Sequence, residues 1–290
     1  MKIIDENTSN FEELNQRFSI VDLSQKKLFK AGINVSWREK GSGQPIFFIH
    51  GIGTGSEYWE DQFSILASDY HTIAWDMPGY GASDNISAPP FDVDSYTRVA
   101  VELISTLGIR NCHFVGQSLG ALIAARLAAQ FPELVLSVTL SHPLVGLGRM
   151  PKSEREAVAA ARIRLFEELG PLRFAHEKGP AILGPNANQA LRQKVIRLMS
   201  GVRVQAVRNA VSMMTNADIF SDLSLIEVPM MVVCGDCDPV SSLKVCRSIS
   251  AASNIFELGV LSAVGHYGAV EKPREYAELL KRFVKNYLLK

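Results

Sequence analysis

The sequence predicts an α/β protein with a doubly wound, mainly parallel sheet and an inserted helical cap. Apolar segments of strand length alternate with segments of helical periodicity through most of the chain, which is typical of a parallel sheet covered on both faces. One stretch, residues 142–217, carries helical patterns without strands. The chain has 290 residues, of which 47% are hydrophobic, and this is enough to bury a substantial core.

The first part of the predicted core covers residues 1–141. It begins with "FSIVDL" and "LFKAGINVSWREKG", which alternate apolar and polar residues as antiparallel edge strands do, with Ala31-Gly32 as a candidate turn or bulge. Strands and helices then alternate, in the order strand "PIFFIHG", helix 57–68, strand "HTIAWD", helix 94–107, strand "CHFVGQS", helix 119–130 and strand "VLSVTLS".

The predicted cap, residues 142–217, consists of three helices. The first is expected to end at Gly170-Pro171, the second at Gly201, and the third runs to about Asn216. The second part of the core, residues 218–290, resumes the alternation. Its predicted elements are the strand "PMMVVCGD", a helix through "LKVCRSISAA", the strand "NIFELGV" and a closing helix over 273–288.

Composition and charge narrow the function classes. The 30 basic and 30 acidic residues balance, so no net charge attracts nucleic acid or an anionic membrane. The N-terminus lacks the apolar core of a signal peptide, and no long uncharged apolar run occurs. Four cysteines are too few for a disulfide framework, and the C-x-x-C pair Cys234 and Cys237 closes a strand instead of opening a helix. We therefore expect a cytoplasmic monomer or homodimer that acts on a small molecule.

The segment "HFVGQSLGAL" places Ser118 between Gly116 and Gly120, where a predicted strand ends and a helix begins. In that context G-x-S-x-G is typical of a nucleophile elbow, a tight turn that exposes the serine hydroxyl. The alternative is that Ser118 is an ordinary helix N-cap, and the short motif alone does not separate the two. Because open α/β sheets bind ligands at the carboxyl ends of their strands, the position of Ser118 favours a functional role.

A nucleophilic serine needs a base within hydrogen-bond reach and a carboxylate that fixes the tautomer of that base. His266, in "AVGHYG", follows the last predicted strand and is the candidate base. The carboxylate is expected after one of the strands between Ser118 and His266. One of these strands, "MMVVCGDCDP", ends with two acids, Asp236 and Asp238. The chain order serine, aspartate, histidine results.

Together these motifs resemble the α/β-hydrolase family, and the resemblance covers nearly the whole chain. It implies a catalytic triad of Ser118, Asp238 and His266, because the family's acid closes a G-x-x-D element that starts here at Gly235. It also implies an oxyanion hole formed by the backbone N–H groups of Ile52 and Leu119, and neither a cofactor nor a metal is expected. The segments that carry the resemblance are "HGIG", "DMPGYGASD", "GQSLG", "GDCDP" and "GHYGAVEKP".

The cap is expected to select the substrate. Its sequence looks similar to the branch of 3-oxoadipate enol-lactonases and small carboxylesterases, which implies a small carboxylic ester or lactone, including an anionic enol-lactone, cleaved through an acyl-enzyme. Residues 151–217 hold eleven Lys or Arg and five Glu, and Arg173 beside the Pro171 break is the first candidate to hold a substrate carboxylate. Trp59, His142 and Tyr267 are further candidate substrate contacts.

Three alternatives remain open. "DMPGYGASD" also resembles hydrolases that split carbon–carbon bonds in meta-cleavage products of aromatic compounds, although these usually carry Trp where Tyr267 follows His266. A second alternative is a small-molecule receptor that retains the fold and the triad. A third is a dinucleotide site at "FFIHGIGTGS", with Asp76 ending the next strand, although G-x-G-x-x-G would need glycine where Ser56 stands.

Overall fold

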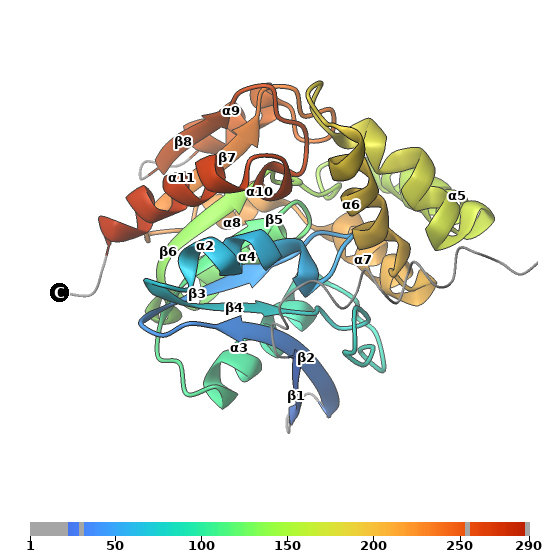
Figure 1. Cartoon of the computed structure of the whole chain (residues 1–290). Helices are drawn as coiled ribbons and strands as arrows, with labels where there is room; N and C mark the ends of the chain where they lie inside the picture. Colours follow the sequence, from blue (N-terminus) through green and yellow to red (C-terminus); the bar gives the residue numbers. More distant parts are fainter. Residues whose placement is uncertain (1–22, 29–31, 253–255, 288–290) are drawn as a thin grey trace, which may run out of the picture.

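A twisted sheet runs through the computed structural model, which describes residues 23–28, 32–252 and 256–287 (Figure 1). The strands of this sheet are β1 (Leu23–Leu28), β2 (Ile33–Lys40), β3 (Gln44–Ile49), β4 (Tyr70–Trp75), β5 (Cys112–Gln117), β6 (Val135–Ser141), β7 (Met230–Gly235) and β8 (Phe256–Leu261). Their order in the sheet is β1-β2-β4-β3-β5-β6-β7-β8. β2 pairs antiparallel with β1 and with β4, and every other pair is parallel. The predicted doubly wound, mainly parallel sheet is confirmed.

Helices cover both faces of this sheet. They are η1 (Ser56–Trp59), α2 (Glu60–Leu66), α3 (Val93–Thr106), α4 (Gly120–Gln130), η2 (Pro132–Leu134), α5 (Lys152–Lys178), η3 (Pro180–Ile182), α6 (Gln189–Ser200), α7 (Val204–Asn216), α8 (Ile219–Leu223), α9 (Leu243–Ala251), α10 (Gly268–Glu271) and α11 (Pro273–Lys285). One apolar core joins the sheet to α3, α4, α8 and α9, and a second joins it to α2, α10 and α11. Among these helices none combines the length and apolarity needed to cross a membrane.

Local sequence explains where several helices begin. α3 starts one residue before the expected position because Asp92 is its N-cap, and the Asp92 carboxylate accepts a hydrogen bond from the Ser95 backbone N–H at 2.9 Å. The helix expected over 57–68 is divided into the 3₁₀ turn η1 and the α-helix α2. Most of the "FSIVDL" strand and Ala31 lie outside the described residues. The "LFKAGINVSWREKG" segment forms one strand only from Ile33 onward, and Leu28 belongs to β1.

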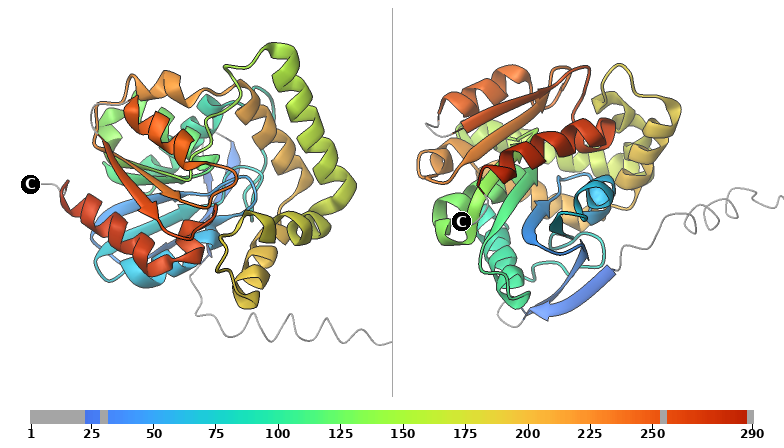
Figure 2. Two further views of the ribbon diagram at one scale, coloured as in Figure 1. Left: turned by 90° about the horizontal axis from the view of Figure 1, so that it is seen from above. Right: turned by 60° about the vertical axis from the view of Figure 1, so that its left-hand side comes forward.

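The first cap helix was expected to end at Gly170-Pro171, and the helical backbone does break there, although a second helical segment follows at once. α5 continues to Lys178 across a kink at Gly170, whose φ of 69° and ψ of 166° are not helical. Gly170 can adopt this conformation because it has no Cβ, and Pro171 then opens the second segment, where its missing N–H costs no helical hydrogen bond. The ribbon views show α5, α6 and α7 as a group beside one end of the sheet (Figures 1 and 2).

The parallel register brings the ends of the central strands together. β5 lies between β3 and β6, and Gln117, its last residue, pairs with Ser141, the last residue of β6. Gly235, which ends β7, pairs with Leu261, which ends β8. The segments that leave β3, β5, β6, β7 and β8 therefore meet at one edge of the sheet, and each of them carries a residue singled out by the sequence.

Candidate active site

Ser118 occupies a strained turn between β5 and α4. Its φ is +53°, a left-handed conformation that a residue with a side chain rarely adopts. The two flanking glycines allow the turn to pack closely: a Cβ at Gly116 would lie 2.3 Å from the Gly120 carbonyl oxygen, and one at Gly120 would lie 2.5 Å from that of Ile49. No other residue fits either position without moving the backbone. The turn thus has the geometry of a nucleophile elbow, and Ser118 makes no N-cap hydrogen bond to α4.

Three side chains predicted from separate parts of the sequence form a continuous hydrogen-bonded chain. The Ser118 Oγ lies 2.9 Å from His266 Nε2, and His266 Nδ1 lies 2.9 Å from Asp238 Oδ2. Because a carboxylate can only accept, Nδ1 carries the proton and donates it to Asp238. Nε2 is then left as the acceptor for the Ser118 O–H. This is the tautomer that a general base needs to take a proton from serine.

Asp238 is held by both of its carboxylate oxygens. Oδ1 accepts hydrogen bonds from the backbone N–H groups of Val240 and Ser241, at 2.7 and 2.9 Å, and Oδ2 faces the histidine side. Burial raises the pKa of Asp238, but hydrogen bonds from His142 and His266 outweigh it and hold that pKa well below its ordinary value. Asp236, the alternative acid, is exposed and accepts a hydrogen bond from Ser262 Oγ at 3.1 Å instead.

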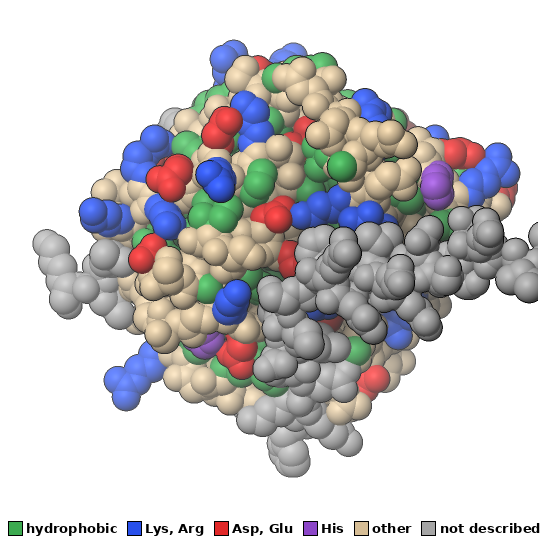
Figure 3. Space-filling view, in the orientation of Figure 1, with side chains coloured by type: hydrophobic (Ala, Val, Ile, Leu, Met, Phe, Trp, Pro, Cys, Tyr) green, Lys and Arg blue, Asp and Glu red, His purple; other side chains and the backbone are tan. Residues whose placement is uncertain are grey.

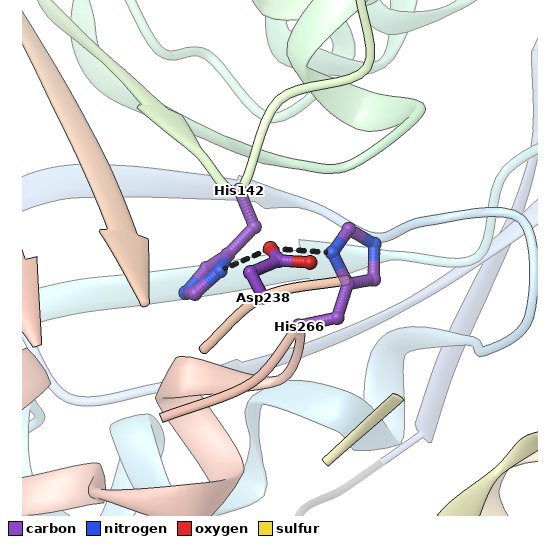
Figure 4. A group of neighbouring side chains, drawn as sticks. All are labelled: His142, Asp238 and His266. Atoms are coloured by element: carbon purple, nitrogen blue, oxygen red, sulfur yellow. Dashed lines mark hydrogen bonds and ion pairs between the residues drawn. The ribbon is translucent and has the colours of Figure 1, made fainter. Parts of the chain in front are cut away.

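A second imidazole also contacts the acid. His142, directly after β6, places its Nδ1 3.0 Å from the same Asp238 Oδ2 that His266 contacts (Figure 4). His142 is fully buried, and this burial lowers its pKa, so the ring is neutral at pH 7 and donates from Nδ1. The three residues have the donor types of a metal site. The two imidazoles contact Asp238 directly, at 2.9 and 3.0 Å, which are ordinary N–H···O hydrogen-bond distances. The three side chains therefore form a hydrogen-bond network.

Two backbone N–H groups near Ser118 have no acceptor among the described residues. They belong to Leu119, the residue after the serine, and to Ile52, in the turn that follows β3. Gly51, just before Ile52, packs so tightly against the elbow that a Cβ there would lie 3.1 Å from Ser118 Cβ. Unpaired N–H groups beside a nucleophile are what an oxyanion hole requires.

His50 supports the turn that carries Ile52. Its Nε2 accepts a hydrogen bond from the Met77 backbone N–H at 3.0 Å, so Nδ1 carries the proton and donates to the Gly51 carbonyl at 2.8 Å. Burial lowers the pKa of His50 to about 4, which keeps the ring neutral at pH 7. The Tyr80 hydroxyl donates to the Ile52 carbonyl at 3.1 Å. Both side chains hold the turn in place, and His50 has no free nitrogen to carry a proton in catalysis.

Sequence reasoning missed Glu271, which lies at the end of α10. Its carboxylate accepts hydrogen bonds from the backbone N–H groups of Gly265 and Tyr267, on either side of His266, and from Gly184 beside the cap turn η3. The His266 backbone N–H in turn donates to the Ile182 carbonyl of η3 at 2.7 Å. Glu271 therefore ties the His266 loop to the cap. Its only signal in the sequence was its place inside "GHYGAVEKP".

We expect the substitution Glu271→Ala to lower kcat/KM by roughly 10- to 100-fold, because an error of about 1 Å in placing a reacting group costs that much. Loss of a charged acceptor for three N–H groups should also lower the free energy of unfolding by about 2 kcal/mol. The matched control is Glu275→Ala, because Glu275 is exposed and its contact among the described residues is a surface ion pair with Lys272. Wild-type kcat/KM in a destabilised Glu271→Ala enzyme would show that Glu271 supports folding alone.

The structure does not bring all of the candidate substrate contacts to Ser118. Trp59 is fully buried in the core against Phe48 and Tyr276, so it is a packing residue and not a wall of the site. The Arg173 side chain is 70% exposed and pairs with Glu177 on the surface of α5, so it does not turn inward. His142 is fully buried, and its Nδ1 is engaged with Asp238 Oδ2 at 3.0 Å.

Tyr267 is the candidate substrate contact that does lie near the predicted oxyanion hole. A Cβ at Gly53 would lie 3.1 Å from the Tyr267 hydroxyl oxygen and 3.5 Å from Met199 Cε of the cap helix α6. The Tyr267 ring stacks on His266 and meets Tyr58 edge to face, so this residue lies between His266 and the turn that carries Ile52.

The cap's surplus of basic residues is distributed over its surface. Lys152, Arg173 and Arg208 pair with glutamates of the cap itself, and Lys194 pairs with Asp61 of the core. In the space-filling view, Lys and Arg side chains are interspersed with Asp and Glu over the visible face (Figure 3). The charge of these four residues thus belongs to a solvated surface.

The residues of the dinucleotide alternative are already engaged. The buried Asp76 carboxylate accepts hydrogen bonds from the Ser56 backbone N–H at 2.8 Å and from the Ser36 hydroxyl at 2.6 Å. An acid that binds a ribose would need to face an open cleft. Here the Asp76 carboxylate instead holds the start of η1 against β2 and β4. The dinucleotide alternative therefore lacks a free acidic residue that could bind the ribose.

Comparison with known proteins places these features in a family. Residues 44–273 match the family model described as the alpha/beta hydrolase fold. A 3-oxoadipate enol-lactonase of Acinetobacter baylyi is 23% identical over 252 residues, covering 83% of this chain and 88% of the relative. An (E)-2-((N-methylformamido)methylene)succinate hydrolase of the same organism is 33% identical over 120 residues, or 41% and 44% of the two chains. The crystal structure of an enol-lactonase from Burkholderia xenovorans superposes with a TM-score of 0.79 at 18% identity, covering 90% and 100% of the chains.

Proposed function

Because this chain belongs to the alpha/beta hydrolase fold family, we propose that it is a serine hydrolase that cleaves a small carboxylic ester or lactone through an acyl-enzyme. One observation carries the proposal: Ser118 Oγ, both nitrogens of His266 and Asp238 Oδ2 form an unbroken hydrogen-bonded chain, with each contact at 2.9 Å. This chain begins at a strained turn next to two unpaired backbone N–H groups. Such an arrangement fits acyl transfer better than any binding role.

In the first half of the reaction, Ser118 Oγ attacks the carbonyl carbon while its proton passes to His266 Nε2. The carbonyl π electrons move to oxygen, and the Ile52 and Leu119 N–H groups stabilise the resulting oxyanion. Asp238 stabilises the positive charge that His266 acquires. When the carbonyl re-forms, the bond to the leaving oxygen breaks, and the His266 proton goes to that oxygen. With an ester, an alcohol leaves and an acyl-enzyme remains. With an enol-lactone, the ring opens and the enol end stays attached to the acyl chain of the acyl-enzyme.

In the second half, a water molecule replaces the alcohol. His266 Nε2 takes a proton from this water as its oxygen attacks the acyl carbon, and a second oxyanion forms at the same two N–H groups. Collapse of this intermediate breaks the bond to Ser118 Oγ, which recovers its proton from His266. The free carboxylic acid leaves, and the site returns to its starting state.

The proposal treats residues 142–217 as a cap between two parts of the hydrolase core, 1–141 and 218–290. Contact between the His266 loop and η3, through the Ile182 carbonyl and Glu271, supports a cap that closes over the triad. Ser118 is 4% exposed, which fits a nucleophile that the cap shields from bulk solvent. Tyr267 is the proposed substrate contact, since its hydroxyl lies next to the turn that carries Ile52.

The substrate class rests on the relatives. Two of them are named for enol-lactone and succinate substrates, which carry carboxylates. A small anionic ester or enol-lactone is therefore the first candidate. The proposal also includes a cytoplasmic location, which the free state of all four cysteines supports.

The test combines a covalent label with a substrate panel. A fluorophosphonate should label Ser118, as located by peptide mass spectrometry. The panel pairs carboxylate-bearing and neutral esters, enol-lactones, and the dienones that carbon–carbon hydrolases cleave. Turnover of esters or lactones supports the proposal. Faster cleavage of dienones would assign the carbon–carbon reaction, a single slow turnover with retained ligand would indicate a receptor, and labelling at another residue would overturn the assignment of the nucleophile.

A further inference from the structure

Asp238 Oδ2 accepts hydrogen bonds from two imidazoles, whereas the proposed mechanism needs only one. His266 Nδ1 lies 2.9 Å from this oxygen and His142 Nδ1 lies 3.0 Å from it. The two rings approach the oxygen from different strand ends and pack edge to face, with centroids 5.8 Å apart (Figure 4). The ring of His142 therefore belongs to the same buried network as the proposed base.

We propose that His142 is a positioning residue that fixes the Asp238 carboxylate and limits how strongly it holds the proton of His266. This inference rests on the proposed function, since it assigns a role at the same site. His142 does not touch the substrate or the reacting atoms. It acts through Asp238, by donating its Nδ1 proton to the oxygen that also accepts the Nδ1 proton of His266.

The local structure of His142 carries two energetic costs. Its φ is +45°, in the left-handed region that disfavours side chains. Its Nε2 is buried with no hydrogen-bond partner in the described part of the chain. Gly268 makes room for that nitrogen, because a Cβ at Gly268 would lie 2.4 Å from it. An apolar residue at position 142 would avoid the unpaired nitrogen.

The backbone around His142 aims its ring at the acid. The His142 N–H donates to the Val233 carbonyl at 2.7 Å, which fixes the residue against the end of β7. The Ser241 hydroxyl donates to the Pro143 carbonyl at 2.7 Å, and the Ser241 N–H donates to Asp238 Oδ1 at 2.9 Å. The loop that carries Asp238 and the segment that carries His142 are thus joined on both sides of the Nδ1–Oδ2 contact.

The electrostatic consequence follows from the groups around His266. Asp238 is the carboxylate on its Nδ1, and Ser118 is on its Nε2. Tyr267 stacks on its ring, and the Glu271 carboxylate binds the backbone N–H groups on either side of it. His142 is the remaining titratable neighbour, and burial keeps it neutral by lowering its pKa. Its N–H withdraws charge from Oδ2, so removing that N–H concentrates the charge of Asp238 on His266.

A pair of nearly isosteric variants tests this. His142→Asn keeps an N–H donor near the position of Nδ1 and tolerates positive φ, whereas His142→Leu removes the donor. In His142→Leu we expect the acid limb of the kcat/KM–pH profile to move upward by roughly half to one pH unit, since the negative charge of Asp238 then acts on the His266 ring alone. In His142→Asn the midpoint should stay within about 0.2 pH unit of wild type.

The matched control is His113→Leu. His113 is also buried and neutral, and its Nδ1 bonds to Ser137 Oγ at 2.7 Å away from the acid. Its loss should lower stability and leave the pH midpoint unchanged. Equal midpoints in His142→Leu, His142→Asn and wild type would reduce His142 to a structural role and overturn the inference.

A second measurement does not depend on hydrolysis. Proton NMR of the resting wild-type protein should show two imidazole Nδ1–H signals far downfield of the amide region, one each from His142 and His266. His142→Asn should lose one of them. A single signal in wild type would overturn the inference even if His142→Leu fails to fold. Loss of fluorophosphonate labelling with both signals present would instead refute the proposed function and leave the shared oxygen intact.

Discussion

The substitution Ser118→Ala should lower kcat/KM by on the order of 10⁶-fold and abolish fluorophosphonate labelling. Without Oγ no acyl-enzyme can form, and the remaining catalysis comes from the N–H groups and from substrate binding. The φ of +53° at this position strains alanine about as much as serine, so the substitution does not change the backbone strain. The melting temperature should therefore stay within a few degrees of wild type, and steady-state kinetics with a thermal melt check both expectations.

Ser137→Ala is a control with the same chemistry in another place. Ser137 Oγ lies 2.7 Å from His113 Nδ1, so the protein contains a second buried serine–histidine contact. The Nε2 of this imidazole has no hydrogen-bond partner among the described residues, and the pair lies near the starts of β5 and β6, at the other end of these strands. Ser137→Ala should cost about 1 kcal/mol of stability and leave kcat/KM within about twofold. A comparable loss of activity in both variants would mean that Ser118 matters for folding and not for chemistry.

The sequence predicted the fold because strand and helix periods alternate clearly through most of the chain. The sequence located the break at Gly170-Pro171, but it did not reveal the second helical segment up to Lys178, because Gly-Pro usually ends a helix and α5 is held by packing against α6 and α7. Element bounds shifted by a residue or two where a cap controls them, as with Asp92 before α3.

Ser118, Asp238 and His266 could be found because each follows a strand and the register of a parallel sheet brings strand ends together. Trp59 and Arg173 could not be assigned in this way. Whether an aromatic residue near a strand end lines a site or fills the core depends on the neighbours it meets, and Trp59 meets Phe48 and Tyr276. A helical arginine has an exposed and a buried face, and its position in the sequence does not say which one it occupies.

His142 shows a different limit. Its position after β6 marked it as a functional candidate, but the partner of its ring was decided by a loop nearly a hundred residues later in the chain. Likewise, Glu271 acts through three backbone N–H groups that no side-chain motif can reveal. Residues whose partners lie on distant loops therefore emerge only once the loops are in place, whereas residues that follow strand ends can be proposed in advance.

The substitution Asp238→Asn should lower kcat/KM by about 10⁴-fold, because it forces the wrong tautomer on His266. The carboxylate accepts four N–H groups, from Val240 and Ser241 on Oδ1 and from His142 and His266 on Oδ2. Asparagine has one acceptor oxygen and one NH₂ donor. If the oxygen faces the backbone, the NH₂ faces both histidines, and His266 must move its proton to Nε2, where it can no longer accept from Ser118. If the NH₂ faces the backbone, its two N–H groups meet the N–H groups of Val240 and Ser241, and no acceptor lies between these buried donors.

Stability and a neighbouring variant complete this prediction. The pKa of Asp238 lies below its ordinary value of 3.8, so its ionised form stabilises the fold above that pH, and this contribution is lost as the pH falls through the folded-state pKa. The difference in unfolding free energy between wild type and Asp238→Asn should accordingly be largest near neutral pH and should shrink below about pH 4. Asp236→Asn, two residues away and exposed, should leave kcat/KM within about twofold. If Asp236→Asn lowered kcat/KM more than Asp238→Asn, Asp238 would not be the acid that orients His266, and its assignment to the triad would be wrong.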